Sequence, residues 1–169
     1  VVVAATLGGW IATAALADDA ANLASGLVLV DMPVKPDPQI AGEIASRLRA
    51  RHDQHASEWD ERTLGGFPLE TISTVLMEAA PRLMLPTLIV RGGLSWMQRS
   101  PENSLFETAL PNAESAEVED ADLLIVTDRT EAFLGLLLDF LDRKQPRSAH
   151  EFRAGTDART LRDAMGCFA

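Results

Sequence analysis

The sequence is poor in cysteine and in positive charge, and it has no long hydrophobic run. The single cysteine, Cys167, excludes an intrachain disulfide and is typical of a reducing compartment, so we expect a cytoplasmic location. Fifteen Lys and Arg residues stand against 25 Asp and Glu residues, which gives a net charge of −10. An acidic chain without a basic cluster is not expected to bind nucleic acid. No apolar stretch reaches the length of a membrane span, so no membrane partner is expected either.

The remaining composition is that of a globular domain. Hydrophobic residues make up 47% of the 169 residues and charged residues 24%, which is enough for about one domain with a core. The chain opens inside a predicted strand at Val1 and closes at Ala169 without a turn. We therefore expect it to be a piece of a longer polypeptide.

Short apolar runs alternate with helical patterns along the chain. The runs predict strands at Val1–Val3, Leu27–Val30, Thr87–Val90 and Ala116–Val118. The helical patterns cover residues 9–21, 39–59, 69–80 and 130–141, and a further helix opens at Ser100-Pro101, with Ser100 as its cap. This alternation predicts the fold class: α/β, with a mainly parallel sheet and flanking helices.

Four stretches carry a resemblance to a known family. They are Ala4-Ala-Thr-Leu-Gly-Gly9, Gly26-Leu-Val-Leu-Val-Asp31, Leu85-Pro-Thr-Leu-Ile-Val-Arg-Gly92, and Leu110–Ala113 continuing to Thr127–Phe133. In this order and spacing, residues 1–144 resemble the C-terminal half of an α/β-hydrolase-fold domain. The resemblance implies that residues 39–80 form a helical cap insertion. It also implies a missing N-terminal half, with the strands that precede the elbow.

The resemblance also assigns a catalytic site, position by position. In that family a serine nucleophile stands on a sharp strand-to-helix turn, the nucleophile elbow. Here Thr6 stands at the nucleophile position, and Leu7 follows it at the position whose amide serves the oxyanion hole. Trp96 stands at the position of the acid, and Leu123 at the position of the histidine. All three triad positions are therefore substituted.

We therefore expect no hydrolase activity from this triad. Threonine is a poor choice at the tip, because a β-branched side chain is badly tolerated at the positive φ that the elbow requires. One alternative is an active hydrolase that uses Thr6 or residues of the missing half. Another is a binding module that holds a small apolar ligand or a partner domain.

Two other polar clusters contain residue types that bind metal ions. His52, His55 and Glu58 are spaced three residues apart on a predicted helix, which is the spacing of a partial metal site. Residues 114–122 contain five acids without the regular spacing of a calcium loop. In both cases a solvated surface is the favoured interpretation, so no metal site is predicted. Trp10, Trp59 and Trp96 either line an apolar pocket or pack in the core.

The composition changes after residue 144. Residues 145–151 read as a polar linker, and residues 152–169 are similar to the opening helix of flavin reductases of the FMN-binding split-barrel family. That resemblance implies a downstream domain that uses FMN or FAD and NAD(P)H, with no cofactor in this chain. The alternative is an amphipathic C-terminal helix, whose apolar stripe is Leu161, Ala164, Met165 and Phe168.

Overall fold

The structure, a computed structural model of the chain, describes residues 1–35, 69–95, 100–122 and 124–144. Within these residues, four parallel strands form one sheet in chain order. The strands are β1 (Val2–Ala5), β2 (Leu27–Val30), β3 (Thr87–Gly92) and β4 (Ala113–Val118). The predicted parallel α/β sheet is confirmed, and β3 and β4 are longer than the sequence pattern indicated.

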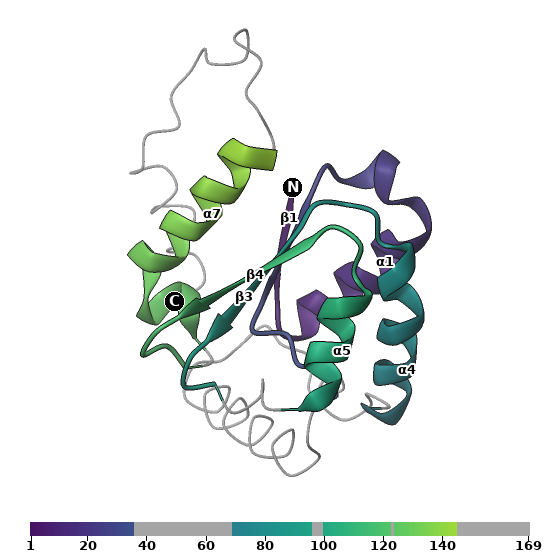
Figure 1. Cartoon of the computed structure of the whole chain (residues 1–169), viewed down its shortest axis with the longest axis horizontal. Helices are drawn as coiled ribbons and strands as arrows, with labels where there is room; N and C mark the ends of the chain where they lie inside the picture. Colours follow the sequence, from purple (N-terminus) through teal and green to yellow (C-terminus); the bar gives the residue numbers. More distant parts are fainter. Residues whose placement is uncertain (36–68, 96–99, 123, 145–169) are drawn as a thin grey trace, which may run out of the picture.

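Helices cover both faces of this sheet (Figure 1). One face carries α1 (Leu7–Leu23), α4 (Leu69–Ala79) and α5 (Pro101–Ala109), and the other carries α7 (Thr130–Lys144). Two short helical turns, η1 (Ala80–Arg82) and α6 (Ile125–Asp128), complete the described elements. No described helix is both long and apolar enough to span a bilayer.

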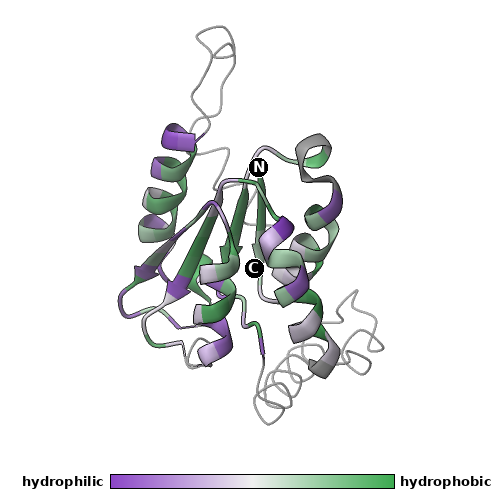
Figure 2. Cartoon of the chain, turned by 45° about the vertical axis from the view of Figure 1, so that its right-hand side comes forward, coloured by the Kyte–Doolittle hydropathy of each residue, from purple (hydrophilic) through white to green (hydrophobic). Residues whose placement is uncertain are grey.

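The strand β2 is the centre of two hydrophobic cores. Its four residues alternate between the two faces: Leu27 and Leu29 join the core under α1, α4 and α5, while Val28 and Val30 join the core under α7. None of the four is more than 2% exposed. A strand buried on both faces loses the apolar-polar alternation, which is why β2 reads as a continuous apolar run. Figure 2 shows the same arrangement as hydrophobic strands between partly hydrophilic helices.

The helix predicted at residues 130–141 is present as α7, and it buries one apolar face. Phe133 and Phe140 are 2% and 0% exposed, and Leu136 and Leu137 pack against the same core. The alanine-rich α1 is buried along one side only. Its Ile11 is 60% exposed, since nothing in the described residues covers that side of the helix.

Two further predictions concern the helix start at Ser100 and the cap at residues 39–80. Ser100 does occupy the position before α5, but its hydroxyl hydrogen-bonds the Glu102 carboxylate and makes no capping bond to the helix backbone. Most of the predicted cap, residues 39–80, lies outside the described residues. Its described end is α4, which packs against α1 in the helical layer on the sheet. The cap therefore stays a prediction.

Candidate functional site

Thr6 stands at the tip of a tight turn between β1 and α1. Its backbone φ is 43°, a left-handed conformation that β-branched residues rarely adopt. Two backbone hydrogen bonds hold the turn: the Thr6 N–H donates to Val30 O at 3.0 Å, and Gly9 N–H donates to Thr6 O at 3.0 Å. Leu7 is the first residue of α1, so its amide is among those that the helix itself leaves unpaired. The structure thus shows a tight strand-to-helix turn with threonine at its tip, at the place where the nucleophile elbow is predicted.

Of the two glycines after Thr6, only Gly9 is required by a close approach. A Cβ added at Gly8 would lie 4.0 Å from the Ala4 Cβ, which is ordinary van der Waals contact. A Cβ at Gly9 would lie 2.8 Å from both Cγ and Sδ of Met32, so this side chain would have to move. The sequence alone does not indicate this contact, because Gly9 and Met32 meet only when β1 pairs with β2.

A buried carboxylate follows the neighbouring strand. Asp31 comes directly after β2, is 0% exposed and has a φ of 45°. Its carboxylate accepts a hydrogen bond from the Ser95 hydroxyl at 2.8 Å and lies 3.5 Å from the Gly92 amide nitrogen, which donates to it. Asp31 therefore ties the turn after β2 to the turn after β3. The sequence signal was available, since a charged residue that directly ends a fully apolar strand lies at the carboxyl edge of the sheet.

The turns after β3 and β4 are joined by their backbones. Gly93 N–H donates to Val118 O, and Leu94 N–H donates to Ala121 O, both at 2.9 Å. A Cβ at Gly92 would lie 2.5 Å from Ala121 O, a backbone atom that cannot yield easily. These two turns lead to the predicted acid and histidine positions. The two turns that precede those positions are therefore in direct contact.

The residues at those two positions, Trp96 and Leu123, lie outside the described residues. The roles assigned to Thr6, Leu7, Trp96 and Leu123 thus stay predictions. In the part of the chain that the structure describes, the Thr6 hydroxyl makes no hydrogen bond to any side chain.

The chain leaves β2 through a clamped segment, residues 32–35. Trp10 Nε1 donates to Pro33 O at 2.6 Å, and Val34 N–H donates to Asn103 Oδ1 at 2.8 Å. Beyond these, Lys35 Nζ pairs with Glu102 Oε1 at 2.9 Å. The Ser100 hydroxyl, followed by Lys35, lowers the pKa of Glu102 to about 2. Trp10 is therefore a packing and anchoring residue here.

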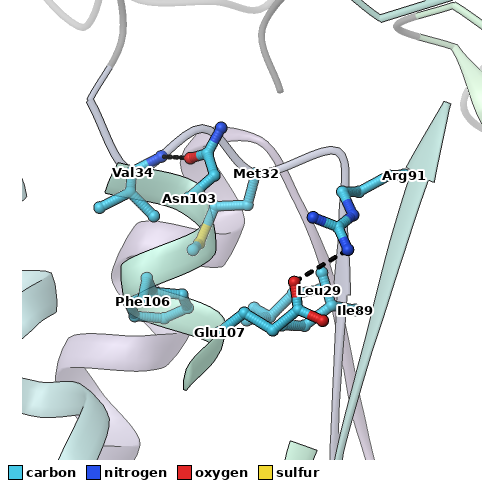
Figure 3. Close-up of a pocket in the computed structure, with 8 residues that line it drawn as sticks. All are labelled: Leu29, Met32, Val34, Ile89, Arg91, Asn103, Phe106 and Glu107. Carbon is cyan, nitrogen blue, oxygen red and sulfur yellow. Dashed lines mark hydrogen bonds and ion pairs between the residues drawn. The ribbon is translucent and has the colours of Figure 1, made fainter. Parts of the chain in front are cut away.

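A small cavity lies between this segment, the sheet and α5 (Figure 3). Its free volume is about 10 Å³, roughly the room that one water molecule requires. An ion pair between Arg91 and Glu107, 2.8 Å apart, lies at its wall. Its lining does not include Thr6, so the cavity is separate from the elbow. The lining residues are Leu29, Met32, Val34, Ile89, Arg91, Asn103, Phe106 and Glu107.

Only some of the candidate metal ligands lie in the part of the chain that the structure describes. His52, His55 and Glu58 lie outside the described residues, as does His150. Among the residues that are described, no group of three or more His, Cys, Asp or Glu side chains is arranged to hold a metal ion. In the acidic stretch 114–122, Glu114 pairs with Arg143 at 2.7 Å, across from β4 to α7.

No family model and no curated protein matches this sequence. Solved structures do match its fold. The meta-cleavage product hydrolase of Pseudomonas fluorescens IP01 superposes with a TM-score of 0.66 at 14% identity, over 83% of this chain and 64% of that one. The peroxisomal α/β-hydrolase Lpx1 of Saccharomyces cerevisiae gives 0.64 at 15% identity, over 98% and 60%.

A third similar structure is the enol-lactonase of Burkholderia xenovorans LB400, with a TM-score of 0.58 at 20% identity, over 82% of this chain and 64% of that one. The chain thus spans less than two thirds of the length of these structures. At such low identity the likeness concerns the fold alone. The parallel sheet, the elbow turn and these neighbours together show that the chain has the α/β-hydrolase fold.

Proposed function

We propose that the chain is part of an α/β-hydrolase-fold domain that keeps the elbow of the fold but does not hydrolyse esters through it. The supporting observation is that the Thr6 hydroxyl makes no hydrogen bond to a side chain among the described residues. A hydroxyl nucleophile needs a base within hydrogen-bond reach, and the base needs a carboxylate to orient it. Within the described residues no such group reaches Thr6, and the buried carboxylate of the neighbouring turn, Asp31, is engaged by Ser95 and Gly92 instead.

The identity of the substituted residues supports the same proposal. Trp96 cannot orient an imidazole as a carboxylate does, and Leu123 cannot accept a proton. Loss of a triad costs on the order of a million-fold in turnover, and only binding and oxyanion stabilisation remain.

A fluorophosphonate probe tests this proposal, since the probe reacts with activated hydroxyl nucleophiles. We expect no labelling at Thr6 in the full-length protein, and none in the Thr6→Ser variant, because the base is still absent. The variant that combines Thr6→Ser, Trp96→Asp and Leu123→His is the matched gain-of-function control. Stoichiometric labelling of the unaltered protein at Thr6 would show that another base serves the site, and an active hydrolase would replace this proposal.

A binding role is favoured by the backbone at the same edge of the sheet. Thr6, Asp31 and Asp120 are non-glycine residues with positive φ, and they follow β1, β2 and β4 respectively. Strained residues of this kind cluster at binding and catalytic sites. We propose that this edge binds a small apolar ligand whose carbonyl oxygen accepts a hydrogen bond from the Leu7 N–H. Short-chain esters should then shift the NMR signal of the Leu7 amide, with the Gly135 amide in α7 as the unaffected reference.

The role of residues 152–169 as the start of a flavin reductase also stays a proposal, carried by sequence resemblance alone. If it holds, the full-length protein should oxidise NAD(P)H when FMN or FAD is added. A full-length protein without that activity would contradict it.

A further inference from the structure

Asp31 is a buried carboxylate in the turn next to Thr6. In the register of β1 with β2, Ala5 lies opposite Val30, so Thr6 and Asp31 are the next residues along the two strands. Asp31 is 0% exposed, and its φ of 45° is left-handed like that of Thr6. Burying a carboxylate costs free energy unless hydrogen bonds replace its water. The hydrogen bonds of Asp31 therefore indicate what its burial serves.

The peptide unit between Val30 and Asp31 is held on both sides. Its carbonyl oxygen accepts the Thr6 N–H at 3.0 Å, and its N–H donates to Val90 O of β3 at 2.8 Å. The carbonyl and the N–H of one peptide unit lie in a single rigid plane, so a rotation of this unit would weaken both hydrogen bonds. The conformation of the Thr6 turn therefore depends on one peptide unit of the neighbouring strand.

The side chain of Asp31 fixes this peptide unit from the turn after β3. Its carboxylate accepts the Ser95 hydroxyl at 2.8 Å and the Gly92 N–H at 3.5 Å. Both donors lie in one turn, 61 and 64 residues further along the chain. Because the end of the side chain is held there, the backbone that carries it is restricted in its rotation. The side chain thus links the turn after β2 to a turn that is distant in the sequence.

The turn that Asp31 holds is itself fixed to the next turn along the sheet. Gly93 N–H donates to Val118 O, and Leu94 N–H donates to Ala121 O, both at 2.9 Å. Hydrogen bonds therefore connect the turn after β1, through Asp31, with the turns after β3 and β4. In this series Asp31 is the residue that joins the first turn to the other two.

We propose that Asp31 is a positioning residue, which sets the conformation of the Thr6 turn and with it the direction of the Leu7 N–H. Its side chain anchors the Val30–Asp31 peptide to the turn after β3, and this peptide holds the Thr6 N–H. The role requires the hydrogen bonds of the side chain and does not require its charge. The inference deepens the proposed carbonyl site at Leu7 and rests on it only for the effect on a ligand, because the coupling of the turns needs no ligand.

Amide hydrogen exchange measured by NMR tests the coupling of the turns. The measured quantity is the exchange rate of the Thr6 amide divided by that of the Leu29 amide, which is buried in the centre of β2 and reports the opening of the whole sheet. Asp31→Gly removes the side chain without adding strain, since glycine tolerates a positive φ. It should raise this ratio at least about tenfold, because the Thr6 turn then opens without the sheet. A role in overall stability alone would not raise the ratio.

Two control variants separate the hydrogen bonds from charge and from backbone strain. Asp31→Asn should keep the ratio within about twofold of the unaltered protein, because its amide can accept from Gly92 and donate to the Ser95 hydroxyl. Asp120→Gly is the matched control, since Asp120 also has a positive φ, of 54°, after a strand, but its side chain is exposed. This variant should leave the ratio unchanged.

Ser95→Ala guards against an Asp31→Gly protein that fails to fold. It removes only the shorter hydrogen bond of the carboxylate, so it should raise the ratio by a smaller factor than Asp31→Gly. A ratio in Ser95→Ala equal to that of the unaltered protein would overturn the proposal. So would a ratio in Asp31→Asn as high as that in Asp31→Gly, because the charge would then be the required property.

Titration with short-chain esters separates this inference from the proposed function. A shift of the Leu7 amide signal that appears in the unaltered protein and is lost in Asp31→Gly supports both. If no variant shows a shift while Asp31→Gly still raises the exchange ratio, the carbonyl site is contradicted and the coupling of the turns is supported. An equal shift in the unaltered and Asp31→Gly proteins would overturn the positioning of the Leu7 N–H by Asp31.

Discussion

Thr6 adopts a backbone conformation that its own side chain disfavours. Its φ of 43° is left-handed, and the Cβ of an L-residue there approaches the following carbonyl oxygen. The conformation persists because hydrogen bonds to Val30 and Gly9 hold the turn from both sides. At the scale of single residues, the elbow is thus maintained by its surroundings and opposed by its own side chain.

Replacing Thr6 by glycine should therefore stabilise the protein. Thr6→Gly removes a strain on the order of 1–2 kcal/mol, partly offset by the flexibility that glycine adds to the unfolded chain. We expect the free energy of unfolding in urea to rise by about 1 kcal/mol. Thr74→Gly, on an exposed and unstrained position of α4, should lower it instead, by up to about 0.5 kcal/mol. A loss of stability at both sites would contradict the strain argument.

Alanine substitutions at Gly92 and Gly135 should change the stability of the protein in opposite directions. A Cβ at Gly92 would press on the backbone oxygens of Ala121 and Asp122, at 2.5 and 2.8 Å, whereas a Cβ at Gly135 in α7 meets nothing within 4 Å. Gly92→Ala should lower the free energy of unfolding by about 1–3 kcal/mol through overpacking. Gly135→Ala should raise it by about 0.5–1 kcal/mol, since alanine favours the helix. Thermal unfolding of the two variants, measured side by side, tests whether their stabilities change in opposite directions.

At the scale of elements, side-chain contacts hold the exit of β2 between two helices. The segment 32–35 receives Trp10 from α1, and Asn103 and Glu102 from α5. Asn103 is 5% exposed, and its acceptance of the Val34 N–H satisfies a backbone donor that would otherwise be buried unpaired. These contacts set the direction in which the chain leaves the sheet toward residue 36.

The Glu102 carboxylate should make the stability that comes from the contacts of residues 32–35 sensitive to acid. Because its pKa is about 2 in the folded protein and 4.5 without these contacts, its contribution to stability is present above pH 4.5. That contribution is lost as the pH falls from 4.5 toward 2. Urea unfolding across this range should show the difference between unaltered protein and Glu102→Gln shrinking with falling pH. Ser100→Ala removes the largest cause of the lowered Glu102 pKa and should therefore make the loss of stability between pH 4.5 and pH 2 smaller. The same loss of stability in Ser100→Ala as in the unaltered protein would contradict this assignment.

At the scale of the whole molecule, two cores share one thin sheet. The core under α1, α4 and α5 and the core under α7 both draw side chains from β2 and β3, whose residues alternate between the two cores. A defect on either face is therefore transmitted to the same two strands. Stability should depend strongly on the large side chains that fill each core.

Phe140 is the test of the α7 core, since it is the largest fully buried side chain there at 0% exposed. Phe140→Ala should lower the free energy of unfolding by about 3–5 kcal/mol, from lost burial and the cavity left behind. Leu105→Ala on α5, where the side chain is 59% exposed, should change it by less than about 0.5 kcal/mol. Denaturant unfolding measures both, and similar losses would contradict the assignment of the core.

The sequence by itself determined the elements of this protein and their order. Apolar runs, helical spacing and the Ser-Pro helix start are local patterns, so the parallel sheet, α4 and the inward face of α7 could be read from them. The turn at Thr6 was also local, because two alanines and two glycines flank one residue. The α/β-hydrolase fold followed from the order of these patterns.

Only the tertiary structure decided the contacts among the turns. Asp31 and Ser95 are 64 residues apart, Val34 and Asn103 are 69 apart, and Gly92 meets the turn at Ala121 only through the pairing of β3 with β4. Each contact requires strands to be in register before the side chains can meet. Periodicity reports the face on which a residue lies, but it cannot report which distant loop ends beside it.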